Sequence, residues 1–259
     1  MSATLLPALG SGGLVGFSLG LVGGGGSILA TPLLLYVVGV ADPHVAIGTS
    51  ALAVSVNAYA NLIAHARKGH VRWRCAAVFA LAGTLGALLG SSLGLAVDGR
   101  RLLLLFGGLM VVVGLLMLKP RAAGAVAERP ADARTCAVTG GAALLTGMAS
   151  GFFGIGGGFL IVPALVLATG MPMINAIGSS LLAVGTFGLA TALNYARSGL
   201  VDWGIAAQFI AGGVAGGILG MMLATRLSTG KATLNRIFSA PILTVAAYVI
   251  VRNLPAALG

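Results

Sequence analysis

The sequence predicts an all-α polytopic membrane protein with two homologous halves, each of about four transmembrane segments and each with a first helix broken by glycines. Only 8% of the 259 residues are charged and 58% are hydrophobic, whereas a soluble protein carries about 25% charged residues. The second observation is a duplicated glycine-rich sequence. GFSLGLVGGGGSILATP at 16–32 returns as GMASGFFGIGGGFLIVP at 147–163.

Apolar stretches predict where the membrane segments lie. They run over 5–40, 43–66, 74–97, 102–118, 136–169, 172–196, 204–227 and 234–251. A bilayer core needs about 20 helical residues, so most of these stretches fit one crossing. The first and the fifth are too long for one crossing, and they contain the glycine clusters. Each is predicted to form a helix, a break and a second half-helix, which either turns back or completes the crossing.

The internal similarity extends beyond the glycines and divides the chain. Ile47–Ser50 matches Ile177–Ser180, and Trp73 matches Trp203, at an offset of 130 positions. Chance similarity between apolar segments would not repeat such residues in register. We therefore predict a first transmembrane repeat at 1–118, a charged linker loop at 119–134 and a second transmembrane repeat at 135–259.

The basic residues predict how the protein is oriented in the cytoplasmic membrane. The net charge of +10 is interpreted as the excess of lysine and arginine that flanks cytoplasmic loops, rather than as a nucleic-acid surface. With eight segments, ten basic residues fall on the side of the termini and five on the other side, so both termini are expected in the cytoplasm. If each glycine break adds a crossing, the halves become five-segment units in inverted orientation.

The glycine motif favours an anion site over a nucleotide site. A dinucleotide loop needs an acidic residue about 20 positions further on, and a phosphate loop needs Gly-Lys-Ser/Thr; neither is present. Consecutive glycines disfavour a helix by up to about 1 kcal/mol each and predict unwound backbone. Half-helices that start near Ser27 and Gly158 would present free N–H groups to one anion. The substrate site is predicted to include Gly23, Gly24, Gly25, Gly26, Ser27, Gly154, Gly156, Gly157 and Gly158.

Polar side chains in the following segments complete the predicted site. The hydroxyl and amide candidates are Thr49, Ser50, Asn57, Ser179, Ser180 and Asn194; the alternative is that they bond their own helices or hold helices together. Arg67 and Arg197 end these segments, and either draw anions to a pore or anchor the interface. Pro32 and Pro163 help to define where the half-helices begin. His65 and Tyr195 are expected to be interfacial anchors.

Charge and motif content exclude several classes of function. The five acidic residues fall at segment ends or in loops, which argues against a metal-cation substrate. No histidine has metal-ligand spacing with a cysteine or an acid, so neither a metal site nor a cofactor is expected. No nucleophile–base pair indicates an enzyme.

The paired motif resembles a known family. GLVGGGGSILATPLL and GFFGIGGGFLIVPAL, followed by IGTS and IGSS, are similar to the two repeats of the TauE/SafE family over about 5–252. Gly24 stands where the second copy has Ile155, so the two copies are not equivalent. The resemblance implies a carrier of sulfite or related organosulfur anions, and implies export as its direction.

The expected function is a secondary transporter of small sulfur-containing oxyanions. Its expected partners are the anionic substrate and the lipid bilayer, with no nucleic acid, and a homo-oligomer stays open. The sequence contains no ATP-binding motif, so an ion gradient or the substrate gradient would drive transport. The alternatives are a passive anion channel and a carrier of another small organic anion.

Overall fold

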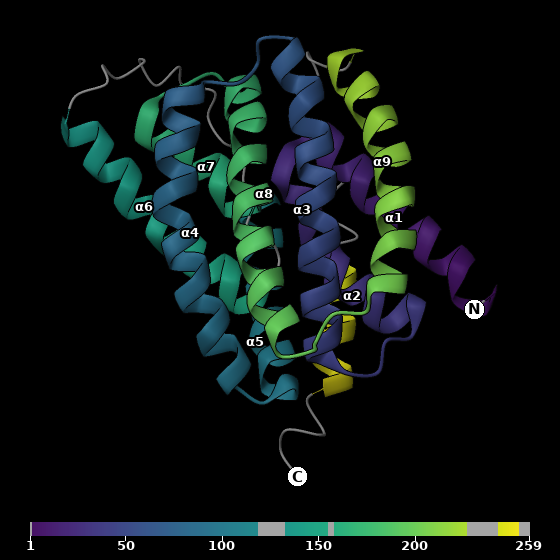
Figure 1. The fold of residues 1–259 in the computed structure, drawn as a ribbon. Helices are drawn as coiled ribbons and strands as arrows, with labels where there is room; N and C mark the ends of the chain where they lie inside the picture. Colours follow the sequence, from purple (N-terminus) through teal and green to yellow (C-terminus); the bar gives the residue numbers. More distant parts are fainter. Residues whose placement is uncertain (1, 119–132, 155–157, 227–242, 254–259) are drawn as a thin grey trace.

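The computed structural model describes residues 2–118, 133–154, 158–226 and 243–253, and these residues form helices and connecting turns with no strand (Figure 1). The elements follow one another as α1 (Ser2–Val22), the 3₁₀ helix η1 (Gly23–Leu29), α2 (Ala30–Leu33), the π-helical turn η2 (Leu34–Val38), α3 (Pro43–Arg67), α4 (Trp73–Ala96), α5 (Gly99–Leu118), α6 (Ala133–Phe153), α7 (Gly158–Thr169), α8 (Met173–Arg197), α9 (Trp203–Arg226) and a final helix, Leu243–Asn253. The all-α prediction is confirmed.

Five helices of the described residues are long and apolar enough to cross a membrane. They are Thr4–Leu21, Pro43–Arg67, Trp73–Ala96, Met173–Arg197 and Trp203–Leu223. Four shorter apolar helices accompany them, at Gly26–Val38, Val138–Phe153, Leu160–Thr169 and Leu243–Asn253. The two glycine-rich stretches that are too long for one crossing are each divided, as predicted, into a long helix and shorter helical pieces.

Helices α3 and α8 pack side by side at the centre of the bundle, with α4 and α9 on their flanks (Figure 1). The Ser55 hydroxyl on α3 donates a hydrogen bond of 2.7 Å to the Gly185 carbonyl on α8. Tyr59 also contacts Gly185, while Ala51 contacts Gly188. Residue numbers therefore rise along α3 as they fall along α8, and the two central helices are antiparallel.

Small residues let the outer helices approach these central helices closely. An added Cβ at Gly16 of α1 would collide with the backbone of Gly213 on α9, and one at Gly147 of α6 would collide with that of Gly83 on α4. Such contacts between small residues are the usual means of helix association in a membrane, where lipid offers no hydrophobic gain. The seams α1–α9 and α4–α6 thus each join a helix of the first half to a helix of the second.

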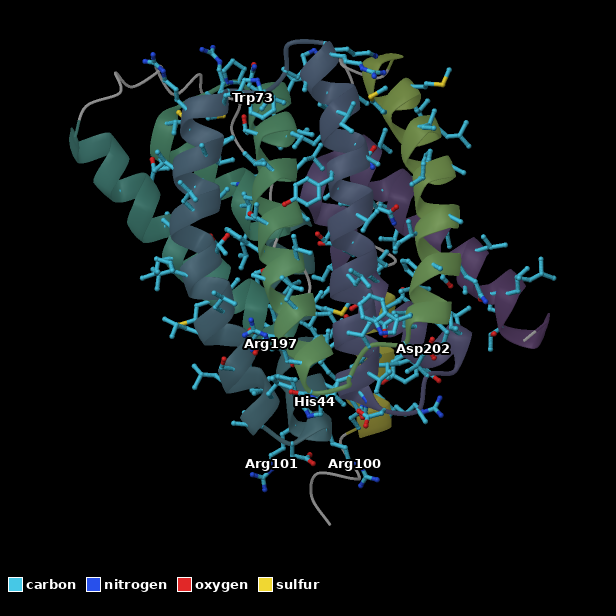
Figure 2. All side chains as sticks on the ribbon, viewed as in Figure 1. His44, Trp73, Arg100, Arg101, Arg197 and Asp202 are labelled. Atoms are coloured by element: carbon cyan, nitrogen blue, oxygen red, sulfur yellow. The ribbon has the colours of Figure 1, made fainter. Side chains whose placement is uncertain are left out.

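The turns after α3 and α8 show that the halves are inverted. The Arg72 N–H donates to the Ser179 hydroxyl at the start of α8, and the Asp202 N–H donates to the Thr49 hydroxyl at the start of α3, both at 2.9 Å. The turn 68–72 therefore lies at one end of the bundle, the α3–α4 end, and the turn 198–202 lies at the other, the α8–α9 end. Figure 2 shows Trp73 at the first end and Arg197 with Asp202 at the second.

This inversion changes which basic residues share one side of the membrane. The eight-segment prediction assigned Arg67 and Arg197 to one side of the membrane, but they end antiparallel helices and lie at opposite ends of the bundle. The structure instead matches the alternative in which each glycine break reverses the chain. Gly23 packs near the start of α8, whereas α3 begins at the opposite end, so Gly23–Val38 leads back across the bundle. The predicted linker lies almost wholly outside the described residues, and α6 begins at Ala133.

Close packing in the α1–α9 seam predicts the effect of a single methyl group. Gly16→Ala should lower the free energy of unfolding by about 1–3 kcal/mol, because its Cβ would force α1 away from the Gly213 backbone. Gly10→Ala on the same helix is the matched control, since a Cβ there meets no atom within 4 Å. The melting temperatures of the purified proteins in detergent provide the measurement. Equal melting temperatures for both variants would contradict the tight seam.

Candidate functional site

The first glycine cluster forms a 3₁₀ helix rather than the unwound backbone that its sequence predicts. Gly23 ends α1 with a left-handed backbone (φ +74°), a conformation that glycine adopts without strain. Gly24, Gly25, Gly26 and Ser27 then continue in the seven-residue 3₁₀ helix η1. The i→i+3 bonds of such a helix pair backbone groups that unwound glycines would leave free. Runs of this length are uncommon, and a 3₁₀ stretch between helices often marks a hinge.

The second glycine cluster begins in the same way. Gly154 ends α6 with φ +66°. Gly156 and Gly157 lie outside the described residues, and α7 starts at Gly158, which is buried. Pro163 lies inside α7, beyond its first residues, and Pro32 is buried inside the short helix α2. Both prolines thus belong to the second helical piece of each broken stretch.

Each break packs against the serine-containing segment of the other half. A Cβ at Gly23 would lie 2.9 Å from Ile177 Cγ2 and 3.4 Å from the Ser180 hydroxyl on α8. A Cβ at Gly154 would collide with the side chain of Ile47 on α3. We call these contacts the first junction (Gly23, Ile177, Ser180) and the second junction (Gly154, Ile47). In addition, η1 packs directly against α7, which brings the two glycine-rich regions side by side.

Hydroxyl groups surround the junctions, and all of them are fully buried. Ser180 donates to the Ile177 carbonyl at 2.8 Å, and Ser50 donates to the Ile47 carbonyl at 3.0 Å. Ser50 also shares a 2.9 Å hydrogen bond with Thr31 of α2. A hydroxyl has one proton to donate, so either serine must rotate away from its helix to bind an anion. Thr49 and Ser179 already accept N–H groups from the turns, which gives them a role in the fold.

The two predicted amides do not lie at the junctions. Asn194 donates to Ser91 at 2.9 Å and to Ser92 at 3.2 Å, and so joins α8 to α4. Asn57 is buried against Gly213 in the α1–α9 seam. The structure therefore brings together the glycines and the serines of the predicted site, while the asparagines occupy separate places.

Four residues assigned to the segment ends divide into two groups. Arg67 and Arg197 are exposed, at opposite ends of the bundle. His65 and Tyr195, expected as interfacial anchors, are 1% and 0% exposed. The expectation for these two is wrong, because α3 and α8 are the most enclosed helices and their last turns are covered by neighbouring helices.

A cavity of about 990 Å³ opens at the α8–α9 end, where α3 and α5 begin and the final helix ends. Asp42 and Asp98 line it, but each carboxylate accepts backbone N–H groups from the helix that follows. Arg100 and Arg252 supply positive charge to the wall, and Figure 2 shows Arg100 at this end. The Arg252 guanidinium lies 5.4 Å from the centre of the Tyr36 ring. The wall thus carries two arginines and two aspartates, so its formal charges balance and the guanidinium groups act as local donors only.

No pattern in the sequence predicted this cavity, which we call the vestibule. Arg100 and Arg252 lie outside the repeated motifs, and only the folded chain brings them to one cavity. Among the described residues, no three His, Cys, Asp or Glu side chains are grouped in a way that could hold a metal ion. The hydroxyls at the junctions and the guanidinium groups in the cavity wall are separate sets of donors, and both kinds of group suit an oxyanion.

Comparisons with known proteins agree on the class of the chain. The family model described as "Sulfite exporter TauE/SafE" matches residues 8–249. A protein of Xylella fastidiosa named "Probable membrane transporter protein" is 68% identical over 96% of both chains. The Bacillus subtilis "Probable membrane transporter protein YunE" is 28% identical over 82% of this chain and 85% of its own. No solved structure matches.

The first junction is open to a test with two glycines of the same conformation. Gly23→Ala should reduce substrate transport strongly, because the methyl group meets Ile177 and Ser180 in addition to the strain of a left-handed backbone. Gly39→Ala is the matched control, since Gly39 has φ +86° but its Cβ would meet no atom within 4 Å. Transport is measured in proteoliposomes at equal protein content. Equal losses in the two variants would assign the effect to backbone strain alone.

Proposed function

Because the chain belongs to the TauE/SafE sulfite exporter family, we propose that it exports small sulfur-containing oxyanions, such as sulfite or small sulfonates, across the cytoplasmic membrane. The chain is a membrane transporter with several apolar helices. We propose its substrate class and its direction of transport.

The observation that carries the proposal is the crossed pair of junctions. Each glycine break contacts a central helix of the other half, and the two halves run in opposite directions. Transporters built from inverted halves place the substrate where the halves meet, beside discontinuous helices. A movement that separates Gly23 from α8 at the first junction can close Gly154 onto α3 at the second. Such an exchange would expose one site alternately to the two sides of the membrane.

The polar groups at these places favour an anion. The Ser50 and Ser180 hydroxyls can turn toward a ligand, and the first residues of α7 present N–H groups that favour negative charge. The vestibule at the α8–α9 end adds Arg100 and Arg252. The aspartates of the described residues lie in turns or at helix starts, where they would not oppose an anion in the bundle.

A passive anion channel is the second candidate, and the open cavity at the α8–α9 end, beside Arg100 and Arg252, is the observation that favours it. Pores also use helix starts and basic rings to select anions. Saturation of the rate with substrate, and exchange of labelled for unlabelled substrate, are expected for the carrier. A flux that rises linearly with concentration and shows no exchange would favour the channel.

The inverted arrangement leads us to propose that the α3–α4 end faces the cytoplasm. Cytoplasmic ends carry an excess of Lys and Arg, and this end has Arg67, Lys68, Arg72 and Arg74, with Arg134 where α6 begins and Arg226 where α9 ends. The opposite end has Arg100, Arg101, Arg197 and Arg252. Since α1 begins and the final helix ends at the α8–α9 end, this orientation puts both of these helix ends outside the cytoplasm, whereas the sequence predicts cytoplasmic termini.

The substrate proposal predicts a serine effect on affinity. Ser180→Ala should weaken the apparent affinity for sulfite or a sulfonate by roughly ten- to a hundredfold, because a hydrogen bond to a charged group contributes about 1.5–3 kcal/mol. Ser92→Ala is the control, since Ser92 is exposed and bonds only its own helix and Asn194. Competition in proteoliposomes between labelled sulfonate and unlabelled anions gives the affinities. Unchanged affinity in Ser180→Ala would remove this serine from the site.

The proposed orientation predicts the fate of a reporter fused to the C-terminus. Alkaline phosphatase folds only outside the bacterial cytoplasm, so its fusion should be active, whereas a green fluorescent protein fusion should be dark. Both fusions are compared at equal membrane abundance, with reporters inserted in the turn 68–72 as the reciprocal control. A bright fluorescent fusion together with an inactive phosphatase fusion would contradict this orientation and would support cytoplasmic termini.

A further inference from the structure

A group of aromatic and polar side chains ties the segment 23–38, which we call the returning segment, to the final helix (yellow in Figure 1). The Asn253 amide donates a hydrogen bond of 2.9 Å to the Tyr36 hydroxyl. The rings of Tyr36 and Tyr248 meet edge to face, with their centres 5.0 Å apart. The Arg252 guanidinium lies 5.4 Å and 5.8 Å from the centres of these two rings, and it donates to the Tyr248 hydroxyl. We call these four residues the clasp.

The backbone beneath Tyr36 departs from an α-helix. Tyr36 lies in the π-helical turn η2, and π turns occur often at functional sites. The turn ends at Gly39, whose backbone is left-handed (φ +86°), and the N–H groups of Gly39 and Val40 both donate to the Leu34 carbonyl. A Cβ at Gly39 would meet no atom within 4 Å. The returning segment therefore ends in an irregular turn with free space around it.

The clasp lies between the vestibule and the glycine-rich helix η1. Tyr36, Arg252 and Asn253 line the vestibule, whose volume is about 990 Å³. About two turns further along the final helix, Ala246 belongs to a buried apolar cluster that includes Ile28 of η1. A passage from η1 to the vestibule along this helix is closed by the cluster and by the clasp. The passage opens only if the returning segment and the final helix separate.

The second half repeats the backbone of this turn without the tyrosine. In the register that matches Pro32 with Pro163, Gly39 corresponds to Gly170, which is also left-handed (φ +70°). Tyr36 corresponds to Leu167, which is 68% exposed. The turn can thus end without an aromatic hydroxyl, so Tyr36 and its partners have a role beyond the shape of the chain.

We propose that the clasp is a gate in the transport path and that it opens in each cycle to join η1 to the vestibule. The inference rests on the proposed function. The contacts suit a gate because water can replace them: Arg252 is exposed, and Tyr248 is 47% exposed. A hydrogen bond that is exchanged for one to water costs little, whereas breaking a buried bond leaves an unpaired group. The Thr31–Ser50 bond of the same segment is of the buried kind, so the gate lies at the clasp.

The gate and the first junction lie at the two ends of one segment. Gly23 at its start packs against Ile177 and Ser180, and Tyr36 near its end bonds to the final helix. When Tyr36 separates from Asn253, the returning segment can tilt about the first junction, which moves the rest of it away from the final helix. An anion held near the junctions then reaches the vestibule.

A reversible link across the clasp tests whether it opens. Cys75 and Cys136, the two cysteines of the chain, are replaced by alanine, and Tyr36→Cys is combined with Asn253→Cys. A short bifunctional methanethiosulfonate joins the two thiols, and a reductant removes the link. Linking should nearly abolish the efflux of a labelled sulfonate from proteoliposomes, and reduction should restore it.

Tyr248→Cys combined with Arg252→Cys is the matched control. This pair also removes two members of the clasp, but it places the link within one helix, between side chains one turn apart. Linking it should leave the efflux unchanged, and the mass of the intact protein gives the extent of linking. Undiminished efflux through protein fully linked between positions 36 and 253, or an equal loss in both pairs, would overturn the gate. Absence of efflux from the wild type would instead contradict the proposed function.

A labelling experiment judges the gate without any transport. Ile28 is 0% exposed in the cluster behind the clasp, so Ile28→Cys in the same cysteine-free protein should react slowly with a water-soluble maleimide. Tyr36→Phe removes the hydrogen bond to Asn253 and should raise the reaction rate severalfold, because the gate is then open for more of the time. Tyr59→Phe, at a tyrosine of the α3–α8 contact, should leave the rate unchanged. Equal rates with and without the Tyr36 hydroxyl would count decisively against the gate.

Discussion

The antiparallel contact between α3 and α8 is the constraint on which the rest of the structure depends. The Ser55–Gly185 hydrogen bond fixes their register, and the turn that follows each helix bonds to the first turns of the other through Arg72–Ser179 and Asp202–Thr49. Each of these hydroxyls accepts one N–H group of a turn and so ties the turn at each end of the bundle to the neighbouring central helix. Once the pair is fixed, α4 and α9 must lie on opposite flanks and α1 and α6 must join them.

Glycine has two distinct uses in this arrangement. In the seams, Gly16, Gly147 and their partners remove side chains so that backbones can touch, a role that needs no unusual conformation. At Gly23 and Gly154 the left-handed backbone ends a long helix and turns the chain back. The second use matters for function, because the turn leaves a short helical segment of each half packed against the central helix of the other half. The breaks are thus held by the contacts that would have to change in an alternating-access cycle.

Much of the fold could be predicted from the duplicated motif. The rest could not, and the causes are physical. The apolar runs gave the helices, and the consecutive glycines marked both breaks, because a helix tolerates neither charge in lipid nor repeated glycine. The sequence could not show whether Gly23–Val38 returns across the bundle, since a segment's direction leaves no trace in its composition. The side of the membrane predicted for Arg197 was therefore wrong, and so were the interfacial positions predicted for His65 and Tyr195. The vestibule arginines depend on tertiary contacts alone.

The differences between the matched halves carry as much information as the likeness. Where Thr31 bonds Ser50 in the first half, Val162 stands at the matched position before Ser180, so the two serines have unequal partners. At the matched positions of the central helices, Asn57 in the first half corresponds to Phe187 in the second. An amide thus faces the α1–α9 seam where an aromatic ring faces the α4–α6 seam, although both seams are built on the same kind of glycine contact. The repeated glycine contacts therefore hold the helices together without dictating which side chains pack against them.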